Sequence, residues 1–120
     1  MLLWAAQGST ELPAEAARYI GNIENELIFS IASIWEIVIK NSLGKSSFRV
    51  NPHTLRLRLI ENGYSELPIS GDHVLAVCNL PDLHKDPFDR ILVAQASFEK
   101  ITLLTSDSII GSYPGPIILV

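Results

Sequence analysis

Short apolar segments alternate along the chain with longer segments of helical periodicity, and this alternation most constrains the fold. Strands separated by helices of about ten residues are typical of an α/β domain with a mainly parallel sheet. The strand candidates are nearly all apolar, as expected when helices cover both faces of a sheet. The expected strands are Glu26–Ser30, Ser65–Ile69, Ile101–Thr105 and Pro116–Val120.

Helix boundaries are marked by capping residues and glycines. Ser30 can cap a helix that Gly44 terminates, because serine is a good N-cap and glycine a good C-terminal stop. Asn51 and Ser70 precede two further helical segments, and Asp86-Pro87 precedes another. The expected helices are residues 13–20, 31–43, 52–62, 71–80 and 87–100.

Composition fits one domain over residues 1–120 and excludes several classes of protein. Hydrophobic residues make up 48% of the 120 residues and charged residues 18%, which suits a packed core. The net charge of −4 and the lack of a basic run do not indicate a large nucleic-acid footprint. The one cysteine, Cys78, excludes an internal disulfide and is expected in the core, as is Trp35. No signal peptide or membrane-spanning run is found, so we expect a cytoplasmic protein.

Four acidic residues stand where chemistry is expected in a parallel sheet. Ligands of such sheets bind where the carboxyl ends of strands lead into helices. Asp107 follows one expected strand, and Glu36 lies in the second turn of the helix after another. Asp86 and Asp89 open the helix that precedes the strand of Asp107.

Each of these acids also has a purely structural interpretation. Asp86 is a good N-cap with Pro87 at the first helical position, which alone is worth about 1 kcal/mol, and Asp89 could complete the cap. Glu36 could form a surface ion pair with the lysine four residues later. Asp107 could be the first residue of a local turn.

The apolar surroundings of Glu36 favour a site. Its neighbours are Trp35, Ile37 and Val38, and a charge among such residues costs free energy unless it is compensated. A divalent cation would compensate it, because Mg²⁺ binds carboxylates together with water. Such an ion activates water and stabilises charge on a phosphate. The pattern predicts an acidic metal site without naming its substrate.

Four stretches, "SIASIWEIVIKNSLGK", "LPISGDHVLAV", "LPDLHKDPFDRILVAQA" and "LLTSD", together resemble the PIN domain, and in particular the VapC-type toxins of toxin–antitoxin pairs. The resemblance covers essentially the whole chain. It implies a three-layer α/β/α sandwich and Mg²⁺- or Mn²⁺-dependent endoribonuclease activity on RNA. It also implies a cognate antitoxin as partner, and we expect a homodimer that has no contact with a membrane.

The resemblance assigns roles to six residues. The catalytic and metal-binding acids would be Glu36, Asp89 and Asp107. Supporting residues that cap, orient ligands or contact phosphate would be Asp86, Thr105 and Arg90.

The beginning of the chain departs from the family pattern. Family members usually start with an apolar strand that ends in Asp-Thr-His, whereas this chain starts "MLLWAAQGS". We therefore expect an N-terminal truncation in which the first central strand and its aspartate are missing. Without that carboxylate, metal binding should be poor and RNA cleavage weak or absent. The alternative function is a catalytically inactive PIN-like module for dimerisation or for binding an antitoxin or RNA.

Overall fold

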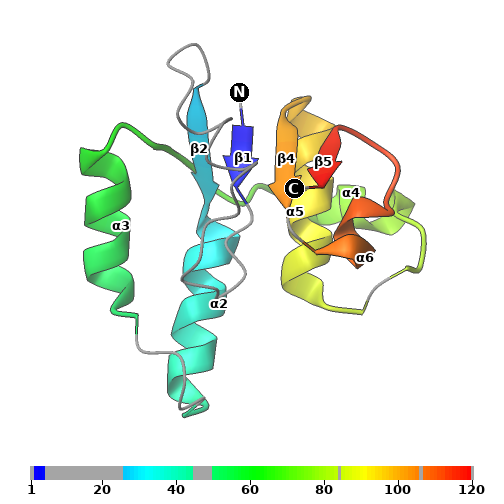
Figure 1. The fold of residues 1–120 in the computed structure, drawn as a ribbon. Coiled ribbons are helices and arrows are strands. Elements are labelled where there is room, and N and C mark those ends of the chain that lie inside the picture. The colour runs from blue at the N-terminus through cyan, green and yellow to red at the C-terminus, as the bar shows by residue number, and fades with distance from the viewer. Residues whose placement is uncertain (1, 5–25, 45–49, 84, 106, 120) are drawn as a thin grey trace.

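The computed structural model describes residues 2–4, 26–44, 50–83, 85–105 and 107–119. In this part of the chain five strands form one parallel sheet in the order β3-β2-β1-β4-β5 (Figure 1). The strands are β1 (Leu2–Trp4), β2 (Leu27–Ser30), β3 (Ser65–Leu67), β4 (Thr102–Thr105) and β5 (Ile117–Leu119). The predicted α/β class with a short, parallel sheet is thus confirmed.

The centre of the sheet is occupied, contrary to the expectation that its first central strand is missing. Leu2 pairs with Leu27 of β2 on one side and with Thr102 of β4 on the other. Neither direct pairing of β2 with β4 nor a strand from a second copy is needed to close the gap. The physical reason is that an apolar tripeptide supplies enough backbone groups to satisfy both neighbours, whose N–H and C=O groups would otherwise be buried without partners.

The described helices follow the predicted boundaries closely. They are α2 (Ile31–Ser42), α3 (Pro52–Glu61), α4 (Gly71–Ala76), the 3₁₀-helix η1 (Val77–Asn79), α5 (Pro87–Glu99) and the short α6 (Ser108–Gly111). The sequence did not predict α6, and the helix expected at Pro13–Ile20 lies outside the described residues. None of the helices in the described part of the chain has both the length and the apolar character needed to cross a membrane.

Side-chain caps explain why three of these helices begin where the sequence predicts. Ser30 Oγ accepts a hydrogen bond from the Ala32 amide at 3.0 Å. Asn51 and Asp86 cap α3 and α5 in the same way, each with proline at the next position. Such caps satisfy amide groups that have no partner within the helix.

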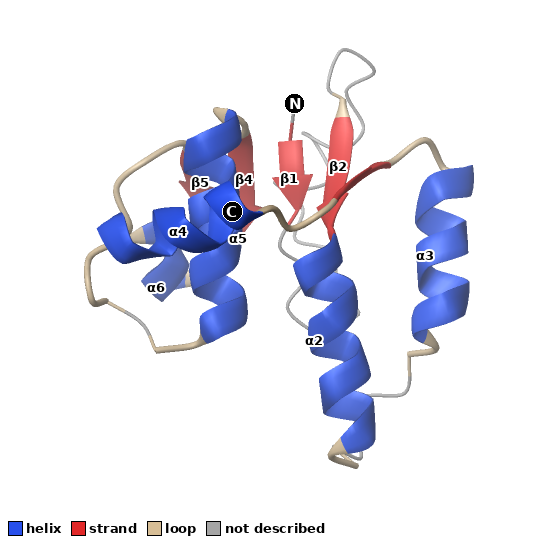
Figure 2. Cartoon of the chain, turned by 180° about the vertical axis from the view of Figure 1, so that it is seen from behind, coloured by secondary structure: helices blue, strands red, loops and turns tan. Residues whose placement is uncertain are grey.

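The core lies between the sheet and α5. Helices α4 and α5 lie on one face of the sheet, with α5 beside β4, behind it in Figure 1 and in front of it in Figure 2. Buried residues of α5 such as Val93 and Ala96 pack with Leu103 of β4 in one hydrophobic cluster. The sheet and this helical layer account for two of the three layers that the sandwich interpretation requires. Cys78, expected in the core, is instead exposed in η1, where the short 3₁₀ turn leaves it in solvent.

A buried polar chain crosses this core and ties α4 to α5. Ser30 Oγ donates to Gln95 Oε1 at 2.6 Å, and Gln95 Nε2 lies 3.4 Å from His73 Nδ1. His73, 1% exposed, accepts from the Ser70 amide at Nδ1 (3.0 Å) and faces Glu99 Oε1 at Nε2 (2.9 Å). Because Nδ1 accepts, the neutral imidazole carries its proton on Nε2, and this N–H donates a hydrogen bond to Glu99 Oε1.

Candidate functional site

Three described helices begin at the carboxyl edge of the sheet. Helix α2 follows β2 directly, α6 follows β4 within three residues, and α5 starts at the edge toward which the strands point (Figure 1). The predicted acids of α2, α5 and α6 are therefore brought to one side of the molecule by the parallel topology.

Glu36 on α2 is largely buried, with its side chain 13% exposed. Its Oε2 lies 3.4 Å from Lys40 Nζ, which is the ion pair that the structural interpretation predicts. Burial raises the pKa of Glu36, and the negative charges of Asp86 and Asp89 raise it further, whereas Lys40 lowers it. Charges on α5 thus act on the acid of α2, so these three carboxylates share one region of the fold.

Asp86 and Asp89 occupy the start of α5. Asp86 Oδ1 accepts from the amides of Phe88 at 2.9 Å and of Asp89 at 3.3 Å, which makes it the predicted N-cap. Asp89 is only 4% exposed. A buried carboxylate is costly unless it is paired or bound, and Asp89 has an interaction within the protein that offsets this cost.

Asp107 caps α6 and is held by the residue that ends β4. Its Oδ1 accepts from the amides of Ile109 at 2.7 Å and of Ile110 at 3.3 Å. Its own amide donates to Thr105 Oγ1 at 3.1 Å, and Thr105 is fully buried. Thr105 therefore orients the turn that carries Asp107. The charge of Asp107 is not among the causes of the raised pKa of Glu36.

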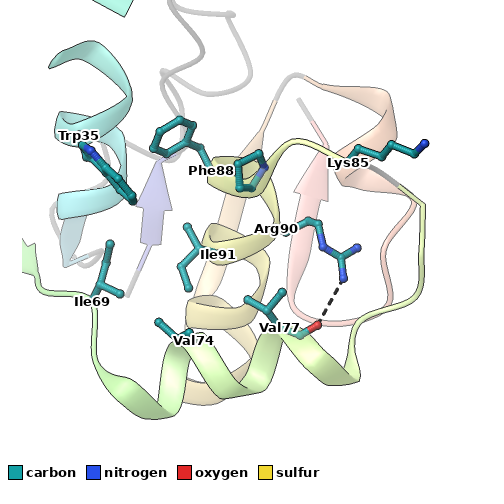
Figure 3. Close-up of a pocket in the computed structure, with 9 residues that line it drawn as sticks. Trp35, Ile69, Val74, Val77, Lys85, Phe88, Arg90 and Ile91 are labelled. Carbon is teal, nitrogen blue, oxygen red and sulfur yellow. Dashed lines mark hydrogen bonds between the residues drawn. The ribbon is translucent and has the colours of Figure 1, made fainter. Parts of the chain in front are cut away.

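Arg90 ties the start of α5 to three neighbouring segments of the chain. Its Nη1 donates to the Pro81 carbonyl at 3.0 Å and to Tyr113 Oη at 3.3 Å, and its Nη2 donates to the Val77 carbonyl at 3.3 Å (Figure 3). These contacts tie α5 to η1, to the segment after it and to the segment after α6. The guanidinium of Arg90 thus holds the first turns of α5, which carry Asp86 and Asp89, against the neighbouring segments.

The donor set has the chemistry of a site for a hard divalent cation. Carboxylate oxygens are the ligands that Mg²⁺ prefers. The pKa of Glu36 is raised first by burial and then by the negative charges of Asp86 and Asp89. Within the described ranges, however, no three His, Cys, Asp or Glu side chains meet closely enough to hold a metal ion. In this arrangement Glu36 pairs with Lys40, and Asp86 and Asp107 accept hydrogen bonds from the first amides of α5 and α6.

An apolar pocket that the sequence did not predict adjoins the acids. It has a volume of about 420 Å³ and opens between α2, α4 and α5 (Figure 3). Trp35, expected in the core, is 54% exposed and packs edge-on against Phe88, with ring centroids 5.1 Å apart. The expectation was wrong because the buried face of α2 is the one with Ala32 and Ile37, which leaves Trp35 beside the pocket.

Ser33 is a second residue of this region that the sequence analysis overlooked. It lies three residues before Glu36 on α2 and is buried, yet its hydroxyl has no hydrogen-bond partner. The signal was present in the sequence, because residues three apart on a helix share a face.

Comparison with protein-family models identifies the family to which the chain is similar. The family model described as the PIN domain matches residues 1–115. A search of curated proteins finds no match.

Proposed function

The chain belongs to the PIN domain family, whose members are generally nucleases that bind divalent metal ions, and from this membership we propose that it is a metal-dependent endoribonuclease of the VapC toxin type. The proposed reaction is hydrolysis of RNA phosphodiesters. A bound Mg²⁺ or Mn²⁺ would supply an activated water and stabilise charge on the phosphate.

The observation that carries the proposal is the burial of two acids on neighbouring helices, because the side chain of Glu36 on α2 is 13% exposed and Asp89 on α5 is 4% exposed. We assign Glu36, Asp89 and Asp107 as the residues that would hold the ion. Asp86 would then keep the first turn of α5 in place as its cap, and Thr105 would do the same for Asp107. Arg90 holds α5 against η1, so that the acids of α5 keep their position.

We infer that the activity is weak. The central strand β1 consists of Leu2, Leu3 and Trp4, and none of these residue types has an oxygen in its side chain. A cation would also have to displace the ammonium of Lys40 or share the carboxylate of Glu36 with it. Both features make the free energy of binding a cation less favourable.

The second candidate is a binding module without catalysis, which would take part in dimerisation or capture an antitoxin. The apolar pocket beside Trp35 and Phe88 favours it, since exposed aromatic side chains are common in protein interfaces. A cognate antitoxin and a homodimer belong to the first candidate as well, so partners alone do not separate the two.

Cleavage of structured and unstructured RNA separates the candidates. The wild-type chain should cut RNA with Mg²⁺ or Mn²⁺ and lose this activity with EDTA, and E36Q and D89N should be inactive. E61Q removes an equal charge from the exposed end of α3 and should leave cleavage unchanged. Binding of RNA without metal-dependent cleavage, or cleavage that survives both E36Q and D89N, would reject the nuclease assignment.

A further inference from the structure

His73 is a buried titratable side chain that the proposed nuclease does not use. It is 1% exposed and lies on α4 against α5. Its Nδ1 accepts from the Ser70 amide at 3.0 Å, which closes the capping box of α4, and its Nε2 donates to Glu99 Oε1 at 2.9 Å. A neutral imidazole satisfies this arrangement, because it offers one acceptor and one donor.

A charged imidazolium does not fit the same arrangement. Histidine is the side chain that ordinarily changes its charge between about pH 5 and 8, and the charged ring carries a proton on both nitrogens. The Nε2 side stays satisfied, because Glu99 supplies a carboxylate there. The Nδ1 side does not, because two donors already point at it, the Ser70 amide at 3.0 Å and Gln95 Nε2 at 3.4 Å.

Gln95 of α5 can accommodate the charged ring by exchanging the two ends of its amide. The side chain is fully buried, its Oε1 accepts from Ser30 Oγ at 2.6 Å, and its Nε2 faces His73. Half a turn of the amide presents Oε1 to the new Nδ1–H and Nε2 to Ser30 Oγ, which is able to accept. The contact of Nε2 with the Pro68 carbonyl at 3.4 Å is then given up.

The hydrogen-bond chain from Glu99 to Ser30 ends at the cap of α2, and the ring itself closes the cap of α4. Ser30 Oγ accepts from the Ala32 amide at 3.0 Å. Helix α2 carries Glu36, and α4 supplies Val74 to the wall of the apolar pocket. The charge of one buried ring is therefore linked to the starts of two helices that border this pocket.

The charged groups around the ring are few in the part of the chain that the structure describes. From α5, Glu99 faces Nε2 with its side chain 39% exposed, and Lys100 after it is exposed. On α4 Asp72 is exposed, and η1 consists of uncharged residues. Glu66 of β3 is paired with Arg56 of α3. Glu99 is thus the charged group that a described contact places against the ring.

We propose that His73 is a proton-controlled switch, in which uptake of one proton from solvent at Nδ1 reverses the hydrogen-bond chain through Gln95 and releases the Ser70 amide. The charged state keeps the contact with Glu99 and gains one with Gln95 Oε1, but it loses the bond that closes the capping box of α4. The proposal goes beyond the proposed nuclease and does not depend on a metal ion or on RNA.

NMR titration of the metal-free wild-type chain from about pH 8 to pH 5.5 tests this switch. The ring nitrogens of His73 and the side-chain amide of Gln95 should shift with one common midpoint. The backbone amides of Ala32 and Ser70 should follow the same midpoint. Protection of the Ser70 amide against hydrogen exchange, corrected for the intrinsic effect of pH, should fall about tenfold because its acceptor is lost. A ring that stays neutral throughout, or that charges while the Gln95 amide is unchanged, overturns the proposal.

A substitution of Gln95 separates the relay from the ring. Q95M keeps a long side chain but removes the acceptor and the donor, so the Ser70 amide should still respond to the charge of His73, whereas the Ala32 amide should not. H53Q, which removes an exposed histidine of α3, is the matched control and should shift as wild type does. An Ala32 response that persists in Q95M, or that disappears in H53Q, contradicts the relay. If Q95M does not fold, the wild-type titration still decides between the outcomes.

Discussion

Lys40 Nζ lies 3.4 Å from Glu36 Oε2, so the acid of α2 that we propose as a metal ligand already faces a cation of its own helix. The two residues are four apart with the glutamate first, which is the favourable order. A metal ion that enters the acidic edge must therefore displace this ammonium or share the carboxylate with it. The affinity of the proposed site for a metal ion therefore depends on the strength of the Glu36–Lys40 ion pair.

Replacing Lys40 should strengthen metal binding. An i,i+4 ion pair of this kind is worth about 0.3–0.5 kcal/mol, so K40Q should bind Mn²⁺ roughly twofold more tightly in a calorimetric titration at low salt. R58Q, which removes an exposed charge from α3, serves as the control and should bind as wild type does. An unchanged or lower affinity of K40Q would show that Lys40 helps to hold the site.

Glu36 should make the stability of the metal-free protein depend on pH. Its pKa is raised in the folded state by burial and by Asp86 and Asp89, so the folded chain binds this proton more tightly than the unfolded chain does. The free energy of unfolding should then fall as pH rises from the ordinary glutamate range through the raised pKa.

E36Q removes this titration. It should be at least as stable as wild type at pH 7, and the difference should vanish below the ordinary pKa of glutamate. Urea unfolding of both proteins across this range measures it. A difference that stays constant with pH, or an E36Q that is less stable at pH 7, would contradict the expectation.

Two substitutions of Asp86 should distinguish its hydrogen bonds as a helix cap from the effect of its negative charge. D86A loses the bonds to the amides of Phe88 and Asp89 and should cost about 1 kcal/mol of stability. D86N keeps an oxygen acceptor at the cap and should cost much less. Because D86N removes a negative charge near Glu36, it should also lower the pKa of Glu36, which NMR titration can follow. If D86N were as unstable as D86A, the carboxylate charge would be responsible, and the hydrogen bonds would not be.

His73 should be far more important for stability than its exposed partner. H73A leaves the Ser70 amide without its acceptor and opens a cavity between α4 and α5, for which we expect a loss of about 2–4 kcal/mol. E99Q alters the half-exposed end of the same contact and should cost less than about 1 kcal/mol. Chemical denaturation compares the two. Equal losses would mean that the hydrogen bond from His73 to Glu99, and not the buried cap, holds α4 in place.

Much of the fold could be predicted because helix starts and stops are local. Ser30, Asn51, Ser70 and Asp86 each cap the helix that follows them, as their sequence positions predict. Each cap joins atoms at most three residues apart, so the residues needed to recognise it stand together in the chain. The four predicted strands were found for a similar reason, since their apolar runs are bounded by such caps and turns.

The sequence predicted which acidic residues belong to the candidate site but not how they are arranged in space. The acids Glu36, Asp86, Asp89 and Asp107 could be selected by their positions after strands and at helix starts. Their coupling could not, because Glu36 and Asp89 are brought together by the packing of α2 near α5 and not by any local pattern. The missing partner of Ser33 and the exposure of Trp35 likewise depend on what surrounds α2.

By itself, then, the sequence determined the helix boundaries, the parallel α/β class and the residues able to carry chemistry. Only the tertiary structure decided that Leu2–Trp4 fills the centre of the sheet, that Glu36 is paired with Lys40 and feels the charges of α5, and that one serine hydroxyl is buried alone. The physical reason is one of range. Caps and periodicity act over a few residues, whereas strand order, burial and the electrostatics of a site depend on contacts between segments far apart in the chain.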